Sequence, residues 1–471
     1  MLFNSHVFVF LFLPVVLLTF YLLRFRLGRP WAAGWLVLAS LLFYGWWNPA
    51  YLPLLLLSVL VNYGIGWRIM HRQAGRRAWL VLGVVFNLSL LGYFKYADFF
   101  LETANLALGR SGGLIAIALP LAISFFTFQQ LAFLVDAYRG KLIWRGFLNY
   151  ALFMVFFPQL IAGPIVHYAQ VSGQFARLPR TVPWQGLAQG LTLFVIGLFK
   201  KVILADGVAP WANEVFAAAE TGAALSPMDA WGGTLAYSLQ LYFDFSGYSD
   251  MALGLGHMFG VRLPINFDLP YRSTSVGEFW RRWHITLGAF LRDYLYIPLG
   301  GNRFGPLRTA LNLMVTMLLG GLWHGAGWTF VLWGGLHGLY LAANYGWTRT
   351  PAAVLLRGAR PLGWLLTFVA VMLAWVLFRA ESLGGALHLY ASMFGLGAAA
   401  GSSIIGLRSL ALLIAVLGLS LTLPASVRWV RRELPRPRWR PSLGLGLAVS
   451  ALFVVAVQNM QRLNEFIYFN F

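Results

Sequence analysis

The sequence predicts an all-α polytopic membrane protein with roughly ten to twelve transmembrane helices, plus re-entrant or interfacial helices that form a central channel. Of its 471 residues, 59% are hydrophobic and only 11% are charged, whereas soluble domains carry about 25% charged residues. Apolar runs close to the ~20 residues that cross a bilayer recur from one end of the chain to the other. This composition excludes a soluble enzyme, so we expect a single membrane domain over residues 1–471.

The predicted domain divides into N-terminal spans at 1–146, a catalytic core at 147–346 and C-terminal spans at 347–471. Each part contains apolar segments that approach the length of a membrane helix, and no internal repeat relates the parts. The segments expected to be helical are 7–23, 31–47, 50–67, 78–94, 114–137, 147–166, 187–205, 309–346 (as a hairpin), 362–378, 404–424 and 443–459.

Thirty-five Lys and Arg against fifteen Asp and Glu give the chain a formal charge of +20. In a soluble protein this excess suggests nucleic acid, but cations gathered in short loops on one side of a membrane set topology. We therefore interpret the charge as topology and contact with anionic membrane lipid, and expect no nucleic-acid partner. The first apolar run is followed by Arg24, Arg26 and Arg29 and preceded by no cation. It is therefore expected to stay in the membrane with its N-terminus outside.

From about residue 147 the apolar pattern becomes irregular. Pro158 and Gly163 interrupt one apolar segment, and Lys200-Lys201 lies near the end of the next. Residues 230–260 mix apolar positions with carboxylates and many glycines. Broken, partly polar segments survive in a membrane only where protein or a water-filled cavity shields the backbone. We therefore expect these segments to be broken, and this half of the chain to contain the functional site.

His324 is the first candidate for that site. Two basic segments, Val261 to Arg308 and 347–361, are expected on the same side, so residues 309–346 between them must form a hairpin or a re-entrant pair. Its break is expected between Gly320 and Gly327, and it contains His324. About fourteen helical residues before it rise ~21 Å, short of a ~30 Å hydrocarbon core, which predicts an imidazole inside the membrane. Such a group is a functional candidate by default; the alternative is a neutral histidine that ties helices together.

His284 is the second candidate, at the end of the run Trp280-Arg281-Arg282-Trp283-His284. Read as one helix, this segment places Trp280, His284 and Leu287 on one face of an amphipathic element at the cytoplasmic surface. Such a stripe is usually a membrane anchor. Arg281 and Arg282 beside Trp283 equally suit the phosphates and the flat ring of a cytosolic acyl carrier such as coenzyme A, so both interpretations stay open.

The motifs that are missing limit the chemistry. The chain has no cysteine for a thioester intermediate, no HExxH or other metal motif, no Walker sequence and no GxSxG elbow. For His167, His257 and His337 a packing role is favoured. A histidine that takes a proton from a hydroxyl is the simplest remaining chemistry, because its pKa near 6.5 leaves it able to accept one at neutral pH.

Several long motifs resemble the membrane-bound O-acyltransferases, and within them the alginate O-acetylase branch. They are the run from Tyr242 to Met251, the Trp-Arg-Arg-Trp-His segment ending at His284, the run from Tyr296 to Arg303, and Gly321 to Gly325. The resemblance implies a helical bundle in the bacterial inner membrane, multi-pass, with its N-terminus in the periplasm. It would take acetyl from a cytoplasmic donor, acetyl-CoA, with no permanently bound cofactor, and supply it for O-acetylation of an exopolysaccharide, alginate first.

The resemblance also implies roles for individual residues. His324 and His284 fall on the family's catalytic positions: His324 would take the hydroxyl proton, and His284 would orient or stabilise the thioester. Arg281, Arg282 and Trp283 would bind the donor. The expected channel or structural supports are Asp293, Trp323 and Gln159. Proteins of this kind work with a periplasmic acetyltransferase or acetyl-relay partner, and no metal is expected.

Three alternatives stay open. Close relatives of the family acetylate cellulose or peptidoglycan by the same chemistry. A polytopic transporter is the alternative from a different class, because Asp244, Asp250 and Glu278 lie near the membrane and suit ion coupling. A glycosyltransferase that uses lipid-linked sugars would need a carboxylate in an outer loop, for which Asp98 and Glu102 are the candidates.

Overall fold

The computed structural model describes residues 1–110, 112–355, 358–397, 403–431, 439–460 and 466–467. All regular elements in these residues are helical, and no strand occurs among them, which confirms the all-α class. Within the described residues, four helical stretches are long and apolar enough to cross a membrane: Phe8–Arg26, Pro49–His71, Arg76–Leu108 and Arg360–Arg379. Leu407–Thr422 and Leu443–Asn459 are shorter apolar helices. The larger number of spans stays a prediction.

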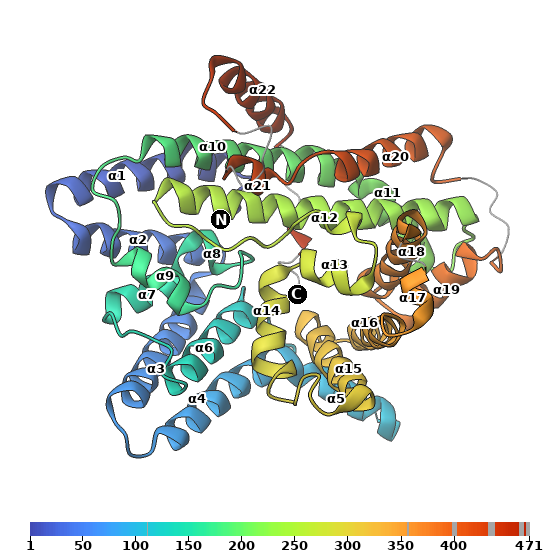
Figure 1. The fold of residues 1–471 in the computed structure, drawn as a ribbon, viewed down its shortest axis with the longest axis horizontal. Helices are drawn as coiled ribbons and strands as arrows, with labels where there is room; N and C mark the ends of the chain where they lie inside the picture. The colour runs from blue at the N-terminus through green and yellow to red at the C-terminus, as the bar shows by residue number, and fades with distance from the viewer. Residues whose placement is uncertain (111, 356–357, 398–402, 432–438, 461–465, 468–471) are drawn as a thin grey trace. The chain divides into compact units, whose positions relative to one another are not determined.

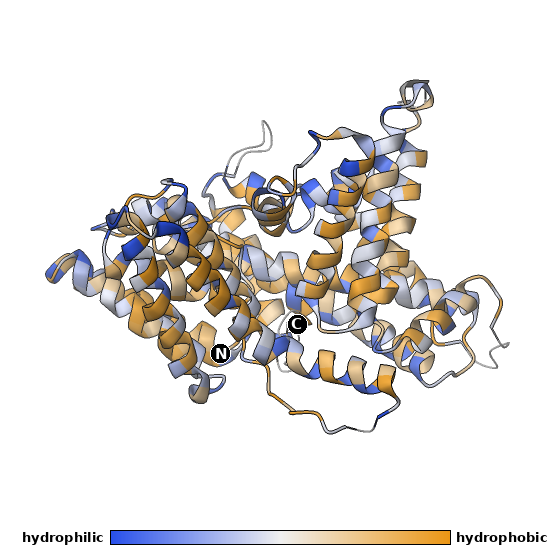
Figure 2. Cartoon of the chain, turned by 90° about the horizontal axis from the view of Figure 1, so that it is seen from below, coloured by the Kyte–Doolittle hydropathy of each residue, from blue (hydrophilic) through white to orange (hydrophobic). Residues whose placement is uncertain are grey.

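The chain forms two compact units, which we describe separately (Figure 1). Unit 1 contains Met1–Leu198, Tyr248–Pro264 and Arg438–Asn470, and unit 2 contains Phe199–Gly247, Ile265–Pro437 and Phe471. Apolar residues run along the helices, and hydrophilic residues gather in loops and at helix ends (Figure 2). Many large apolar side chains are exposed, such as Leu18 at 73%, as expected for helices that face lipid.

Unit 1 is built from paired helices. Its elements are η1 (Phe8–Phe12), α1 (Leu13–Arg26), α2 (Arg29–Gly45), η2 (Pro49–Tyr51), α3 (Leu52–His71), α4 (Arg76–Leu91), η3 (Gly92–Tyr96), α5 (Ala97–Leu108), α6 (Ile123–Tyr138), α7 (Phe147–Val155), α8 (Phe157–Leu160), α9 (Tyr168–Phe175), α10 (Trp184–Phe199) and α22 (Leu443–Asn459). Buried Asn62 of α3 and Asn87 of α4 exchange side-chain hydrogen bonds of 3.2 and 2.6 Å. Such pairs hold helices together where lipid offers no partner.

The expected interruption of residues 147–166 is confirmed. Helix α7 ends at Val155, and the one-turn helix α8 follows with Pro158 in its first turn. Buried Gln159 in α8 donates from Nε2 to the carbonyl of Phe153 at 2.6 Å. Gln159 thus ties the short helix back to α7, which is a supporting role within unit 1.

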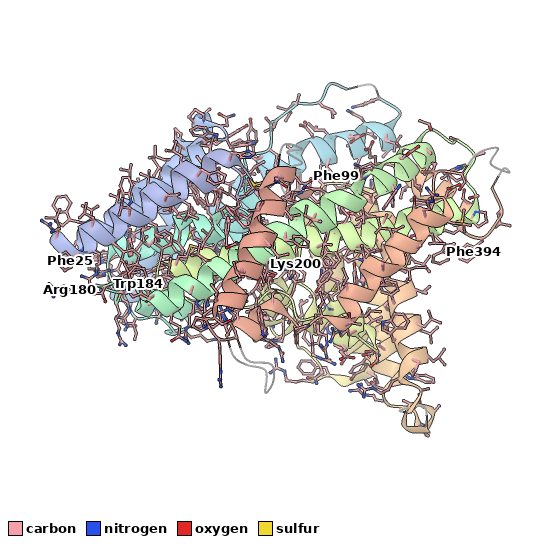
Figure 3. All side chains as sticks on the ribbon, turned by 90° about the horizontal axis from the view of Figure 1, so that it is seen from above. Phe25, Phe99, Arg180, Trp184, Lys200 and Phe394 are labelled. Atoms are coloured by element: carbon pink, nitrogen blue, oxygen red, sulfur yellow. The ribbon has the colours of Figure 1, made fainter. Side chains whose placement is uncertain are left out.

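One end of unit 1 combines arginines with exposed aromatic rings. Arg24 donates to the carbonyl of Leu178 at 3.1 Å, which joins the end of α1 to the segment before α10. Phe25, Arg180 and Trp184 lie at this end (Figure 3), and Phe25 and Trp184 are exposed. Arginines beside aromatic rings are typical of a membrane–water interface.

Unit 2 carries the segments in which the sequence analysis expects the site. Its elements are η4 (Lys200–Ala205), α11 (Asp206–Glu220), the first part of α12 (Pro227–Met258), η5 (Pro270–Arg272), α13 (Val276–Arg282), α14 (Ile285–Leu291), η6 (Arg292–Tyr296), α15 (Gly305–His324), α16 (Trp328–Trp347), α17 (Pro351–Leu355), α18 (Arg360–Arg379), α19 (Leu383–Met393), α20 (Leu407–Thr422) and α21 (Ser426–Val430).

The expectation that residues 230–260 are broken is wrong, because α12 is a continuous helix of 32 residues. Its glycines mark close helix packing: a side chain at Gly233 would meet Val215 of α11. Asp244 is buried and lies 2.8 Å from the ammonium of Lys201. The carboxylate is therefore neutralised within the bundle, and it does not break the helix.

The hairpin is confirmed: α15 and α16 lie side by side (Figure 1). The expected break from Gly320 to Gly327 is wrong in its start, because α15 continues through Gly320 and Gly321 and ends at His324, and only residues 325–327 are non-helical. A Cβ atom on Gly321 would meet the backbone of Phe330 and Gly334, and one on Gly334 would meet the backbone of Met317. The helices approach this closely only because both positions lack a side chain. Helix α15 has 20 residues and a length of about 30 Å, so the expected ~21 Å rise before His324 is wrong. The helix begins at Gly305, four residues before the expected start of the hairpin.

The expectation of one helix through His284 is also wrong. Helix α13 ends at Arg282, and Trp283 has an extended backbone. His284 adopts φ 42°, ψ 54° in the left-handed region, and α14 begins after it. Its ring is fully buried, so His284 is not part of an amphipathic surface stripe.

We expect Gly334→Val to destabilise the α15–α16 hairpin, because the new side chain would meet the backbone of Met317. Overpacking costs about 1–3 kcal/mol, and a backbone clash leaves little room to relax. The measurement is the apparent melting temperature of the purified protein in detergent. Gly346→Val on the same helix is the control, because no atom lies within 4 Å of its added Cβ. Equal melting temperatures for the two variants would contradict the packing argument.

Candidate active site

His324 is the last residue of α15 and lies in an aromatic cluster of unit 2. Its ring centroid lies 4.9 Å from that of Trp323, 5.0 Å from Trp333 of α16 and 5.1 Å from Phe378 of α18. The residue is only 2% exposed. The extended backbone of Gly325 ends α15 directly after it, so the hairpin packing determines where the imidazole lies.

His284 contacts the same tryptophan, Trp323. Its ring centroid is 6.2 Å from that of Trp323 and 4.8 Å from that of Phe245 in α12. The two sequence-predicted catalytic residues, which are distant in the chain, therefore share one neighbour. The bend at His284 turns the ring inward, and a left-handed non-glycine residue costs of order 1–3 kcal/mol, which the surrounding structure must offset.

The chemical state of His284 follows from its burial. Its Nδ1 lies 3.1 Å from the side-chain oxygen of Asn266. Burial lowers the pKa of His284 to about 3, because removing water disfavours the charged form. The residue lies between two helices of seven residues each, too short to cross a membrane. Because its pKa lies far below physiological pH, the His284 ring is neutral there.

The structure separates the three expected donor-binding residues. Arg281 lines a cavity, and its side chain makes no ion pair or hydrogen bond with the described residues. Arg282 is paired with Glu278 at 2.9 Å and lies 3.8 Å from Asp268. Trp283 is buried, with its ring centroid 5.0 Å from that of Trp375. Of the three, Arg281 alone lines this cavity.

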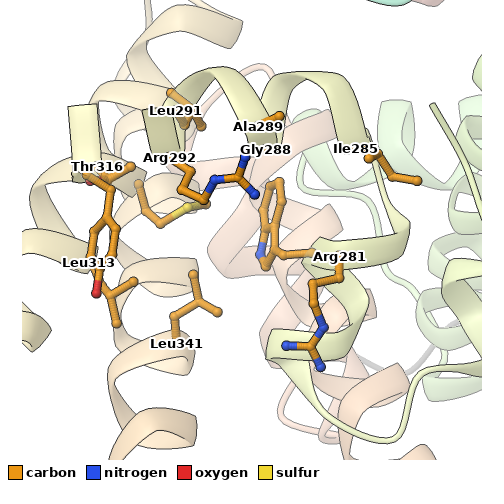
Figure 4. Close-up of a pocket in the computed structure, with 12 residues that line it drawn as sticks. Arg281, Ile285, Gly288, Ala289, Leu291, Arg292, Leu313, Thr316 and Leu341 are labelled. Carbon is orange, nitrogen blue, oxygen red and sulfur yellow. The ribbon is translucent and has the colours of Figure 1, made fainter. Parts of the chain in front are cut away.

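The cavity has a volume of about 360 Å³ and mostly apolar walls. Leu313 and Leu341 line it from the α15–α16 hairpin, and Arg281 lines it from α13 (Figure 4). Arg292 also faces it and is paired at 2.7 Å with Asp293. Asp293 thus holds a cavity-lining arginine, whereas Gln159 lies in unit 1 and Trp323 contacts both histidine rings.

Comparison with known proteins agrees with this arrangement. Residues 144–383 match the model of the membrane-bound O-acyltransferase family. The chain is 45% identical to the peptidoglycan O-acetyltransferase of Helicobacter pylori, covering 84% of this chain and 80% of that relative. It is 46% identical to a probable alginate O-acetylase of Azotobacter vinelandii, covering 84% and 79%. A teichoic acid D-alanyltransferase of Streptococcus thermophilus shares 29% identity over 55% of this chain and 68% of that relative. This chain belongs to the membrane-bound O-acyltransferase family.

The protein is therefore an acyltransferase, and the transporter alternative is set aside. Its described residues contain no group of three or more His, Cys, Asp or Glu that would hold a metal ion. Its membership also confirms the resemblance on which the motif analysis rests. The matched region contains both histidines and the cavity, so the candidate site lies within the part of the chain that matches the family.

Sequence reasoning missed two side chains that shape the site of this acyltransferase. Trp280 lines the cavity and donates from Nε1 to Nδ1 of His337 at 3.2 Å. His337 is one helical turn from Trp333. The ring centroid of Trp333 lies 4.8 Å from that of His337 and 5.0 Å from that of His324. The Trp-to-His spacing of four residues was a visible signal. These contacts agree with the packing role that the sequence favours for His337. Through Trp280, they also connect His337 to the wall of the cavity.

The buried His284 ring predicts an acid dependence of stability. The histidine of the unfolded chain titrates near 6.5, and the folded one near 3, so between these values the unfolded state binds the extra proton. The contribution of His284 to the free energy of folding is fully present above pH 6.5. It is lost as the pH falls toward 3, and the folding equilibrium constant then decreases by up to tenfold per pH unit.

We therefore expect His284→Gln to make the acid-induced fall in apparent melting temperature shallower than in the wild type. His71→Gln, at an exposed histidine, is the matched control. Parallel curves for the wild type and His284→Gln between pH 6.5 and 4 would rule out a neutral buried ring.

Proposed function

We propose that this acyltransferase is an O-acetyltransferase of the bacterial inner membrane, with a periplasmic N-terminus, that supplies acetyl groups to a polysaccharide. The names of its relatives, probable alginate O-acetylase and peptidoglycan O-acetyltransferase, support polysaccharide hydroxyls as the acceptors. The observation that carries the proposal is that His324 and His284 both contact the ring of Trp323.

In the proposed reaction, His324 takes the proton of an acceptor hydroxyl as its oxygen attacks the acetyl carbonyl. The new C–O bond forms, the C–S bond of the thioester breaks, and the proton passes from His324 to the departing thiolate. A positioned general base fits a ring that is 2% exposed among apolar neighbours, because the neutral form is the one that accepts a proton. His284, which contacts the same Trp323 ring, orients the reacting groups.

We propose acetyl-CoA as the donor and the 360 Å³ cavity as its entrance. Arg281, with no partner among the described residues, offers a cation for a phosphate, and the apolar walls suit a pantetheine chain. Trp280 and Trp333, with ring centroids 5.8 Å apart, lie between this cavity and His324. The acetyl group reaches His324 when these rings move, so donor binding and ring movement are coupled in the proposal.

We propose alginate as the first polymer to test and a periplasmic acetyltransferase or acetyl-relay protein as the partner. Peptidoglycan is the second candidate, because the Helicobacter pylori relative carries that name at 45% identity. Acetylated cellulose follows from the same chemistry. Membrane lipid is the remaining partner, at the exposed apolar helix faces.

His324→Ala is expected to lower acetyl transfer by about 10²–10⁴-fold, the usual contribution of a general base. The measurement is the acetyl ester content of alginate, and separately of peptidoglycan, in cells that depend on this protein. Immunoblotting establishes equal protein levels, and His71→Ala controls for loss of an exposed histidine. Retained acetylation in the His324→Ala cells would remove His324 from the mechanism.

Arg281→Ala is expected to raise the KM for acetyl-CoA by about tenfold or more, since one charge-assisted hydrogen bond is lost, while kcat changes little. The assay is transfer of radiolabelled acetyl from acetyl-CoA by the protein in proteoliposomes. Arg349→Ala is the control, because Cζ of Arg349 lies 3.4 Å from the ring centroid of Tyr345 and the residue does not line the cavity. An unchanged KM in Arg281→Ala would exclude this cavity as the donor site.

A further inference from the structure

Asn266 contacts the bend that carries His284 through its main chain and its side chain. The backbone carbonyl of Asn266 accepts a hydrogen bond of 2.9 Å from the backbone N–H of Ile285. Its side-chain oxygen faces His284 Nδ1 at 3.1 Å, the backbone N–H of Thr286 at 3.3 Å and the hydroxyl of Thr286 at 2.9 Å. Asn266, His284 and Thr286 are all buried. Asn266 therefore contacts three successive residues through its main chain and its side chain.

These contacts determine which nitrogen of His284 carries the proton. A backbone N–H can only donate, so the amide atom of Asn266 that faces Thr286 must be its oxygen. The same oxygen faces Nδ1 of His284, and an oxygen that only accepts requires Nδ1 to donate. A neutral imidazole has one N–H, so Nε2 carries a lone pair. His284 therefore accepts hydrogen bonds at Nε2 and cannot donate one there.

His337 has the opposite arrangement. The indole N–H of Trp280 can only donate, so Nδ1 of His337 accepts it and the ring proton lies on Nε2. Both histidines are fully buried in unit 2. The difference between them therefore comes from the chemistry of one neighbour each, asparagine oxygen in one case and indole N–H in the other.

We propose that Asn266 is a positioning residue that fixes His284 in its bend with an unprotonated Nε2, so that His284 orients the acceptor by accepting a hydrogen bond from a second sugar hydroxyl beside the one whose proton His324 takes. This inference rests on the proposed function and specifies the role of His284 within it. A thioester carbonyl offers only lone pairs and would need a donor, which Nε2 of this tautomer lacks. His284 therefore acts on the hydroxyl side of the reaction, whereas the donor is held from the Arg281 side.

The test combines spectroscopy with kinetics. Nitrogen NMR of the full protein in lipid, labelled with ¹⁵N-histidine, reports which ring nitrogen of His284 is protonated. The His284 signals are identified by their loss in His284→Gln. We expect the wild type and Asn266→Asp, which keeps an oxygen at this position, to show the proton on Nδ1. In Asn266→Leu we expect this preference to be lost.

Kinetically, we expect Asn266→Leu to lower kcat about 10–100-fold, as for loss of other residues that orient a functional histidine, with an unchanged KM for acetyl-CoA. Asn266→Asp should restore part of kcat. Asn87→Leu is the matched control, since Asn87 is 1% exposed like Asn266 but belongs to unit 1. It should leave the His284 signals and the kcat of the folded fraction as in the wild type.

Two results would overturn the inference: a wild-type His284 with its proton on Nε2, or an Asn266→Leu protein with the same His284 signals and kcat as Asn87→Leu. The NMR result does not depend on acetyl transfer. If the wild-type protein transferred no acetyl from acetyl-CoA while His284 kept its Nδ1 proton, the proposed function would fail and the Asn266 assignment would stand.

Discussion

The close approach of α15 and α16 is the constraint on which the candidate site depends. Gly321 and Gly334 face each other with no side chain between them, so the two backbones are in contact near the end of the hairpin. His324 follows Gly321 by less than one turn, and Trp333 directly precedes Gly334. The contact between these two rings at 5.0 Å is therefore a consequence of backbone packing. Side chains in such a dense interior have few alternative rotamers, which gives a catalytic base a defined position.

Within this packed layer, single hydrogen bonds decide the chemistry of each imidazole. A buried polar group without a partner costs far more than one in water, so each buried histidine adopts the tautomer that its neighbour permits. Trp280 makes His337 an acceptor at Nδ1, and Asn266 makes His284 a donor at Nδ1. Residue type alone therefore does not define the role of a histidine here, since two equally buried rings present opposite groups at Nε2.

Much of the fold was predictable from composition and local signals, but its long-range contacts were not. The all-helical class and the interruption near Pro158 were predicted correctly, because each depends on hydropathy or on residues that disfavour helices. The hairpin was also predicted, from the basic segments that flank it, but its glycines at 320 and 321 stay helical and the break begins only after His324. The continuity of α12 was missed because its glycines pack against residues far away in the chain, such as Val215 beside Gly233.

The sequence predicted the two candidate histidines of the site better than it predicted the residues around them. The motifs identified His324 and His284, and the structure places both beside Trp323. The bend at His284 depends on Asn266, which no local pattern connects to it. The pairing of Arg282 with Glu278 could have been expected from their spacing of four residues on a helix. Arg281, the neighbour of Arg282 on another face, makes no such pair with the described residues.

The aromatic layer around His324 has a chemical reason in the proposed reaction. A base that activates a sugar hydroxyl activates water equally well, and water would hydrolyse the thioester without acetylating anything. Excluding water from the reacting groups prevents this side reaction. Trp323, Trp333 and Phe378 leave His324 only 2% exposed, so water has little access to the ring in this state. A site that opened permanently to the Arg281 cavity would lose this protection. Movement of the ring layer on donor binding, rather than a standing passage, is therefore the arrangement that reconciles access for the acetyl group with selectivity against hydrolysis.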